Sequence, residues 1–402
     1  MQRPFTKLES ETTLPERATH QQTRAFNQQL VLRAIYDHGR ISRAEVARQT
    51  GLTRTSVSQL VGELLNVGLV SEVGRGPSSG GKAPIMVSVA TDSRHVLGLD
   101  LGEESFRGAL VDLRGEILHS VSLPLDGRDG QAAVDLVLEL VDRLQAQTQR
   151  PLLGIGIGAP GLIDSRSGTV RWAVNLDWAD LALGPLIEER YGLPVALAND
   201  SQAAALAEYT FAADPRPTAR PNSMIVIRVG RGVGAGIILN GQLYQGDGSG
   251  AGEIGHTALV PDGQRCRCGS VGCLETVASL RAMVSAATQV APHVRDEQQL
   301  LAALRAGEPA VAAVVRNAGA MLGLGIAALI GSLNVRRIVL VGPAVALGPP
   351  WLEAVRERAR RSALPLLAQD TQIELGAERD DVLLGASALL LTNQLGLSLV
   401  RR

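Results

Sequence analysis

The chain has 402 residues, of which 45% are hydrophobic and 20% charged, so two or three domains with buried cores are expected. No apolar run reaches the length needed to span a bilayer, and the N-terminus lacks the apolar core of a signal peptide, so no membrane segment is expected. Three clustered cysteines with metal-like spacing predict a reducing, cytoplasmic environment. The net charge of -1 excludes a strongly basic protein, but residues 1–82 carry 11 Lys/Arg against 7 Asp/Glu, a balance that suits a nucleic-acid-binding head.

The N-terminal part divides into a polar segment and a small patterned domain. Residues 1–20 are predicted to form a flexible tail, because they are polar and lack apolar periodicity. Residues 21–90 are predicted to form a winged helix-turn-helix. Ser42 caps a short helix and forms a capping box with Glu45, Gly51 ends that helix, and Thr53 begins the next one.

The second of these helices has the surface of a DNA-reading helix. Its apolar residues are predicted to face the core, and its exposed N-terminal end can meet base edges and phosphates. The candidate DNA-binding residues are Ser42, Arg43, Thr53, Arg54, Thr55, Ser56, Ser58 and Gln59, with Arg75 and Lys82 in the loop of the wing. The alternative is a small helical packing module with a hairpin; the attached wing favours DNA binding.

Two α/β lobes are predicted to follow, at residues 95–215 and 222–402. Strands alternate with helices in both, and the strand, glycine turn, strand and hairpin at Gly98–Glu116 return at Ile225–Gly241. Two lobes of related design place a ligand in the cleft between them.

Polar residues that follow apolar strands are the candidates for that cleft. Asn199 and Asp200 come directly after V-A-L-A, and Glu253, His256 and Glu275 flank a cysteine-containing loop. Carboxylates and amides can bridge adjacent hydroxyls, so the cleft suits a neutral polyol. Further candidates are Gly161 and Asn175. Asn199 and Asp200 also fit a helix N-cap, and the two roles are compatible.

All three cysteines of the chain, Cys266, Cys268 and Cys273, lie in one loop, and His256 precedes them. Three thiolates and an imidazole satisfy the tetrahedral preference of zinc, and four protein ligands predict a structural rather than a hydrolytic ion. The alternative is three buried cysteines and a core histidine, but clustering in one short loop favours a metal.

The chain resembles the ROK family (repressors, open reading frames and sugar kinases) over nearly its whole length. The resemblance rests on G-I-G-A-P-G-L-I-D, A-N-D-S-Q-A-A-A-L-A-E, G-A-G-E-I-G-H and C-R-C-G-S-V-G-C-L-E. It implies two actin-like (ribonuclease H-like) lobes around a sugar cleft, with Asn199, Asp200, Glu253, His256 and Glu275 on the sugar. It also places Asp200 at the general-base position of the kinases and matches His256, Cys266, Cys268 and Cys273 to zinc ligands. The winged helix matches the repressor branch.

The turns that would meet ATP depart from the kinase pattern of the family. The kinases open with D-x-G-G-T, whereas here Glu103 and Glu104 follow Asp100-Leu-Gly102. Two carboxylates repel a triphosphate. Val229-Gly230-Arg231-Gly232 replaces L-G-T-G, and Pro343 removes an N–H donor from the adenosine-side loop.

These departures predict a sugar-responsive transcriptional repressor rather than an enzyme. It would bind double-stranded operator DNA as a homodimer or a tetramer of dimers, because helix-turn-helix half-sites mirror a two-fold axis. One alternative is an ATP-dependent sugar kinase with an appended DNA-binding head. Another is a repressor whose cleft serves a protein partner or a phosphosugar.

Overall fold

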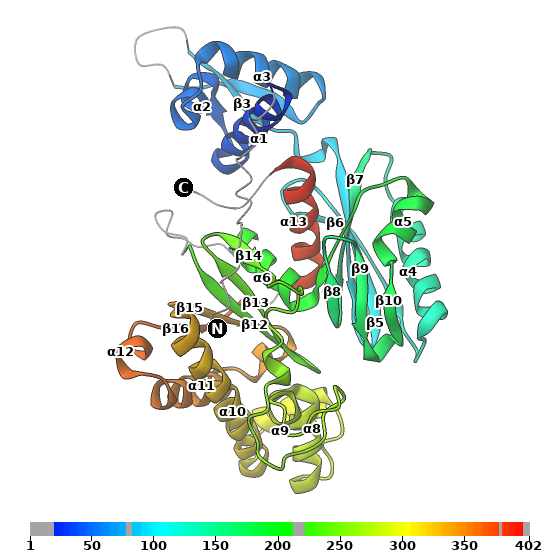
Figure 1. The fold of residues 1–402 in the computed structure, drawn as a ribbon, viewed down its shortest axis with the longest axis vertical. Helices are drawn as coiled ribbons and strands as arrows, with labels where there is room; N and C mark the ends of the chain where they lie inside the picture. The colour runs from blue at the N-terminus through cyan, green and yellow to red at the C-terminus, as the bar shows by residue number, and fades with distance from the viewer. Residues whose placement is uncertain (1–19, 78–82, 212–221, 378–379, 397–402) are drawn as a thin grey trace, which may run out of the picture. The chain divides into compact units, whose positions relative to one another are not determined.

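The computed structural model describes residues 20–77, 83–211, 222–377 and 380–396, which form two compact units, residues 1–89 and 90–402 (Figure 1). Apart from residue 20, the predicted tail lies outside the described residues, and so does Lys82. Each unit is described by itself.

The first unit is a winged helix-turn-helix, as predicted. Its helices are α1 (His20–His38), α2 (Arg43–Thr50) and α3 (Arg54–Asn66), and its antiparallel sheet has the order β1 (Ile41–Ser42), β3 (Ile85–Val89), β2 (Val70–Arg75). Gly51, at φ 71°, makes the tight turn between α2 and α3. The side chains of Ser42 and Thr53 cap the two helices by accepting the backbone N–H of Glu45 and Ser56.

Two details of this unit differ from expectation. The Glu45 carboxylate accepts bonds from Arg48 and Gln49 on its own helix rather than completing the capping box. Leu65, one of the apolar residues of α3 predicted to face the core, is only half-buried, whereas Val61 and Leu64 are buried as predicted.

The first lobe of the second unit is built on a five-stranded sheet. Its order is β11 (Val195–Asn199), β7 (Leu152–Ala159), β4 (His95–Leu101), β5 (Ser105–Val111), β6 (Ile117–Pro124). Helices α4 (Gly130–Gln145) and α5 (Leu183–Tyr191) pack on it. A small sheet has the order β10 (Trp178–Leu181), β9 (Thr169–Ala173), β8 (Leu162–Asp164).

The second lobe repeats this topology. Its sheet has the order β14 (Gln242–Tyr244), β13 (Val233–Leu239), β12 (Met224–Val229), β15 (Arg337–Val341), β16 (Gln372–Leu375). In both lobes the first strand pairs antiparallel with the second and parallel with the fourth, so the echo seen in the sequence is confirmed. The helices are α7 (Glu275–Ala278), α8 (Leu280–Val290), α9 (Glu297–Arg305), α10 (Pro309–Leu333), α11 (Pro349–Ser362) and α12 (Pro365–Ala368).

The C-terminal helix α13 (Asp381–Leu395) crosses back to the first lobe and packs on β4 and β7, beside α6 (Asp200–Phe211) (Figure 1). Glycines on these strands let its backbone approach. A Cβ on Gly156 would lie 2.0 Å from the carbonyl oxygen of Ala386, and one on Gly98 would lie 2.6 Å from that of Leu383. Helix α13, which lies in the segment 222–402 predicted to form the second lobe, thus packs on the sheet of the first.

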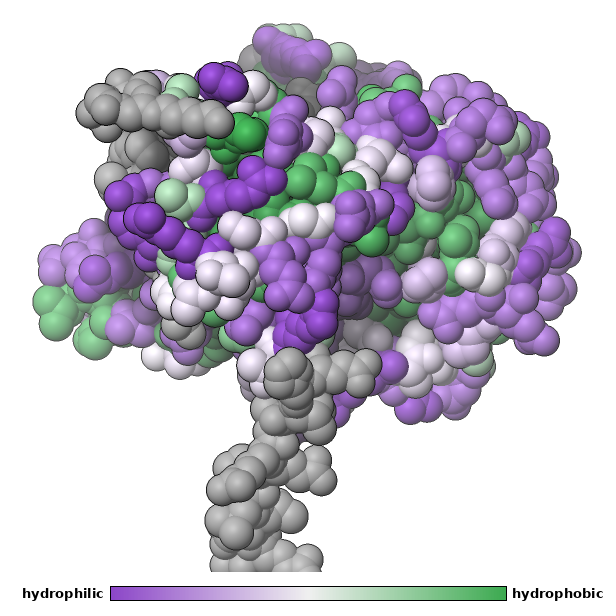
Figure 2. Space-filling view, turned by 90° about the horizontal axis from the view of Figure 1, so that it is seen from above, coloured by the Kyte–Doolittle hydropathy of each residue, from purple (hydrophilic) through white to green (hydrophobic). Residues whose placement is uncertain are grey.

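Helix α10 has 25 residues and is apolar enough to cross a membrane by length and composition alone, contrary to the expectation that no run reaches this length. Its buried residues, among them Val315, Leu322 and Ile330, belong to the core of the second lobe. That burial explains its composition. The face in Figure 2 is mostly hydrophilic, with apolar residues in scattered patches.

Candidate functional site

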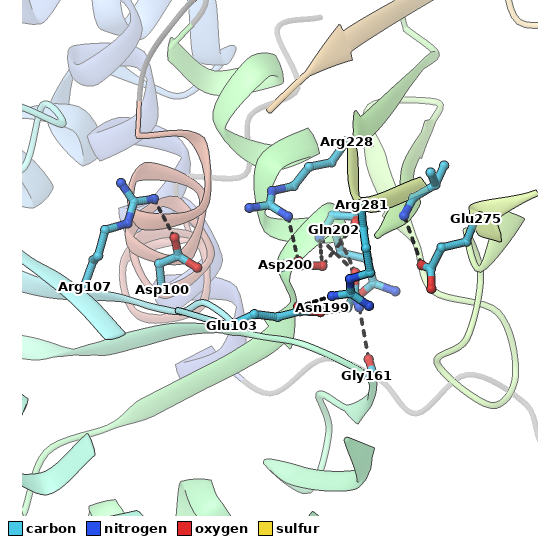
Figure 3. Close-up of polar contacts among 12 residues, drawn as sticks. Asp100, Glu103, Arg107, Gly161, Asn199, Asp200, Gln202, Arg228, Glu275 and Arg281 are labelled. Atoms are coloured by element: carbon cyan, nitrogen blue, oxygen red, sulfur yellow. Dashed lines mark hydrogen bonds and ion pairs between the residues drawn. The ribbon is translucent and has the colours of Figure 1, made fainter. Parts of the chain in front are cut away.

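Asn199 and Asp200 lie where β11 ends and α6 begins. The Asn199 side chain is 8% exposed; its Oδ1 accepts the backbone N–H of Ser201 at 2.9 Å, and its Nδ2 donates to the Gly161 carbonyl at 3.0 Å (Figure 3). Asn199 is therefore a helix N-cap that also fixes the Gly161 loop. The N-cap role considered from the sequence is confirmed, and the contact of Asn199 with a sugar stays a prediction.

Asp200 is held by a partner that the sequence analysis missed. Its Oδ2 accepts a bond from Nη1 of Arg228, at 3.0 Å, and its Oδ1 accepts the backbone N–H of Ser201 (Figure 3). Arg228 lies on β12 of the second lobe, so this ion pair crosses between the lobes. No sequence signal singled out Arg228, because charged residues near strand ends are common.

Glu253, His256 and Glu275 come from the second lobe. Nε2 of His256 lies 3.8 Å from the Glu253 carboxylate, and Glu275 accepts the backbone N–H of Val233 at 3.2 Å. Burial, together with the charges of Asp200 and Glu275, raises the pKa of Glu253 to about 7, and the charge of His256 opposes this. A carboxyl group with such a pKa can donate a hydrogen bond as well as accept one.

Two buried polar atoms of this region lack a hydrogen-bond partner among the described residues. They are Nδ2 of Asn175 and Oε1 of Gln202. Gln202 is 1% exposed, and its amide nitrogen donates to the carbonyls of Ser249 and Ala251. Buried polar atoms are nearly always paired, so these two favour a polar ligand or ordered water.

The predicted metal ligands meet in one place. One ligand atom from each of His256, Cys266, Cys268 and Cys273 lies within 4.8 Å of all the others. The sulfurs of Cys268 and Cys273 are 3.7 Å apart. Tetrahedral ligands at a metal–sulfur distance of about 2.3 Å would be about 3.8 Å apart, so the cluster fits a tetrahedral ion.

The chemistry of the cysteines also bears on metal binding. Cys266 and Cys273 are buried. Burial and the two neighbouring thiols raise the pKa of Cys273 to about 12. A metal that binds here displaces a thiol proton, so its affinity depends on pH.

The β4–β5 and β12–β13 turns, which depart from the kinase pattern, carry charges of opposite sign that take part in ion pairs between the lobes. Glu103, between β4 and β5, pairs with Arg281 at the start of α8, and Glu104 pairs with Arg231, between β12 and β13 (Figure 3 shows the first pair). Asp100 is buried and pairs with Arg107 at 2.6 Å. Pro343 begins the short 3-10 helix Pro343–Leu347.

The candidate DNA-binding residues fall into two groups in the first unit. Arg54, Thr55, Ser58 and Gln59 are exposed along α3, and Arg75 is exposed at the end of β2. Ser42, Arg43, Thr53 and Ser56 are engaged locally: Ser42 and Thr53 are caps, the hydroxyls of Thr53 and Ser56 lie 2.9 Å apart, and Arg43 pairs with Glu72 at 2.8 Å. The exposed Gln59 also donates to Glu63 on its own helix, at 3.2 Å.

Comparison with known proteins identifies the family. A sequence model of the ROK family matches residues 96–393, and a MarR family model matches residues 23–78. This chain belongs to the ROK family. The xylose repressor of Caldicellulosiruptor bescii is 30% identical over 94% of this chain and 98% of its own length. The transcriptional dual regulator NagC of Escherichia coli is 30% identical over 84% and 86% of the two chains.

Solved structures show the same relation. The crystal structure of a ROK family transcriptional regulator, described as a homolog of the E. coli MLC protein, matches with a TM-score of 0.81 and 28% identity over 94% of this ROK chain and 98% of its own. A ROK family glucokinase from Streptomyces griseus, in complex with glucose and AMPPNP, matches with a TM-score of 0.65 and 28% identity, over 73% of this chain and 98% of its own.

Proposed function

We propose that this ROK protein is a sugar-responsive, DNA-binding transcriptional repressor of genes for carbohydrate use, and that it is not an enzyme. The winged helix binds double-stranded operator DNA, and the cleft of the second unit binds a sugar without a nucleotide. The protein acts in the cytoplasm as a homodimer or a tetramer of dimers, because two heads are needed for a two-fold operator.

This proposal rests on the presence of two features in one chain. A winged helix precedes the ROK lobes, and charged residues at the turns of the lobes form ion pairs with each other, Glu103 with Arg281 and Glu104 with Arg231. The full-length relatives that share both units carry the names of repressors and regulators, whereas the glucokinase covers only 73% of the chain.

We assign the sugar contacts to the polar side chains predicted to line the cleft. Asn199, Asp200, Glu253, His256 and Glu275 supply the amide, carboxyl and imidazole groups that bridge adjacent hydroxyls, and Gly161 shapes the loop that Asn199 holds. The unpaired Nδ2 of Asn175 is a free donor for a hydroxyl. In this repressor Asp200 binds the sugar rather than acting as a general base, and Arg228 neutralises its charge.

The metal at His256, Cys266, Cys268 and Cys273 is proposed to be zinc, in a structural role. Four soft or borderline protein ligands leave no open position for water. Bound there, zinc would fix the loop between Glu253 and Glu275, and so the positions of both carboxylates.

The test is calorimetric titration of the purified protein with a panel of pentoses, hexoses, N-acetylated hexoses and 6-phosphosugars, with and without MgATP. An operator gel shift follows with each sugar that binds. We expect one sugar to bind without ATP and to change operator affinity. Sugar-dependent ADP production would instead establish the kinase function, and sugar binding without any effect on DNA would refute the proposed response.

A further inference from the structure

The two charged turns of the second unit form a cluster in which every described arginine has a carboxylate. Arg281 pairs with Glu103, Arg231 with Glu104, and Arg231 Nε also lies 3.7 Å from Glu297 at the start of α9. Arg267, between two of the metal-ligand cysteines, lies 4.0 Å from Glu103. Three arginines thus face three glutamates.

The arginines are placed together by the second lobe alone. The backbone N–H of Leu280, beside Arg281, donates to the carbonyl of Gly230, beside Arg231, at 2.8 Å. This bond ties the start of α8 to the β12–β13 turn. The backbone segments that carry Arg231 and Arg281 are therefore held together by the second lobe itself.

The first lobe supplies the anions. Glu103 and Glu104 are neighbours in the β4–β5 turn, which occupies in the first lobe the place that the β12–β13 turn occupies in the second. Two adjacent carboxylates on one turn carry the charge of a small diphosphate, and arginines bind carboxylates and phosphates with the same geometry.

We propose that Glu103 and Glu104 are specificity-determining residues that close this cleft to nucleotide phosphates by acting as its internal anions. They occupy Arg231 and Arg281, so that a triphosphate meets repelling carboxylates instead of free guanidinium groups. The inference rests on the proposed use of the cleft without a nucleotide, but its test needs neither sugar nor DNA.

The test compares anion binding by the wild type and by E103Q/E104Q, which keeps the shapes of both side chains and removes both charges. Titration calorimetry at low salt uses inorganic pyrophosphate and MgATP as probes. We expect the variant to bind both at least about tenfold more tightly than the wild type, because Arg281 then loses the carboxylate of Glu103 and Arg231 keeps only its 3.7 Å pair with Glu297.

The matched control is E139Q/E353Q, which makes the same change in net charge at helix-surface pairs with Arg143 and Arg356. It should bind the probes as the wild type does. A second variant adds R231A and R281A to E103Q/E104Q and should lose the gain.

Three outcomes would overturn the proposal: no gain in E103Q/E104Q, a gain that survives loss of the two arginines, or a gain for pyrophosphate without one for MgATP. Should E103Q/E104Q fail to fold, E104Q alone still decides, because the Glu104 side chain is 70% exposed and does not hold the core. Its expected gain is about threefold, and wild-type affinity in folded E104Q would refute the role of that residue.

Discussion

At the scale of single residues, substitution of Arg54 tests whether α3 is the helix that binds DNA. Arg54 is exposed at the first position of α3 and makes no ion pair in the structure's described part. Arg54→Ala should weaken operator binding about tenfold, because one guanidinium contact with a base or phosphate is lost, and should leave sugar affinity unchanged. Gel shifts and calorimetry measure the two. Arg336→Ala, which removes an exposed arginine of the second unit, is the control; unchanged operator binding by Arg54→Ala would show that α3 is not the recognition helix.

The two proposed roles of the Asn199 side chain, capping α6 and contributing to sugar binding, can be tested separately. Asn199→Ala should lower the free energy of unfolding by about 1 kcal/mol, because α6 loses its N-cap, and should also weaken sugar binding. Asn199→Ser keeps a cap acceptor, but its side chain is shorter and lacks the Nδ2 that donates to the Gly161 carbonyl. It should therefore recover most of the stability and little of the sugar affinity. Denaturant unfolding and calorimetry separate these effects; full recovery of both would make the Gly161 bond irrelevant to the site.

At the scale of elements, the contact of α13 with the first-lobe sheet depends on missing side chains. Gly156→Ala would place a methyl group 2.0 Å from the carbonyl oxygen of Ala386. The strand and helix must then separate, and we expect a loss of about 2 kcal/mol or more in the free energy of unfolding. Gly331→Ala in α10 is the control, because its Cβ would meet nothing within 4 Å and alanine favours a helix. Equal stability of both variants would mean that α13 does not pack closely.

The same elements show what could be predicted from the sequence. Periodicity and caps located α2 and α3, and the repeated strand–turn–strand pattern predicted two lobes of one topology, because these signals are local. The return of α13 to the first lobe is a long-range contact. The alternating glycines of G-I-G-I-G, with Gly98 on the neighbouring strand, are its trace in the sequence, since their Cβ-free face is what admits the helix.

The candidate site divides in the same way. The residues of one loop, such as Cys266, Cys268 and Cys273, were grouped correctly because their spacing is short. Arg228 and Arg281 were missed, because their partners Asp200 and Glu103 lie in the other lobe, 28 and 178 residues away. Pairing across a cleft depends on how the lobes meet, and no local pattern encodes it.

At the scale of the whole molecule, the proposed function requires coupling between a sugar site in one unit and a DNA site in the other. A coupling of about 1–3 kcal/mol is typical, and it is reciprocal: sugar must change operator affinity by the factor by which operator changes sugar affinity. Both factors can be measured on one preparation. A factor of one for both ligands would show that the sugar site and the DNA site are not coupled.

A substitution in the loop that carries the predicted metal ligands should weaken that coupling at the sugar site. Cys268→Ser removes one of the four ligands, so the loop between Glu253 and Glu275 should lose its fixed shape. We expect sugar affinity and the sugar response to fall about tenfold or more, while operator affinity without sugar stays within about twofold, because the first unit has its own core. Zinc content, calorimetry and gel shifts measure these quantities.

The control is Asp262→Asn, an exposed change in the same loop. It should behave as the wild type, because asparagine tolerates the φ of 53° at this position. Equal loss of sugar and operator binding in Cys268→Ser would mean that the metal serves the folding of the whole chain rather than the sugar site.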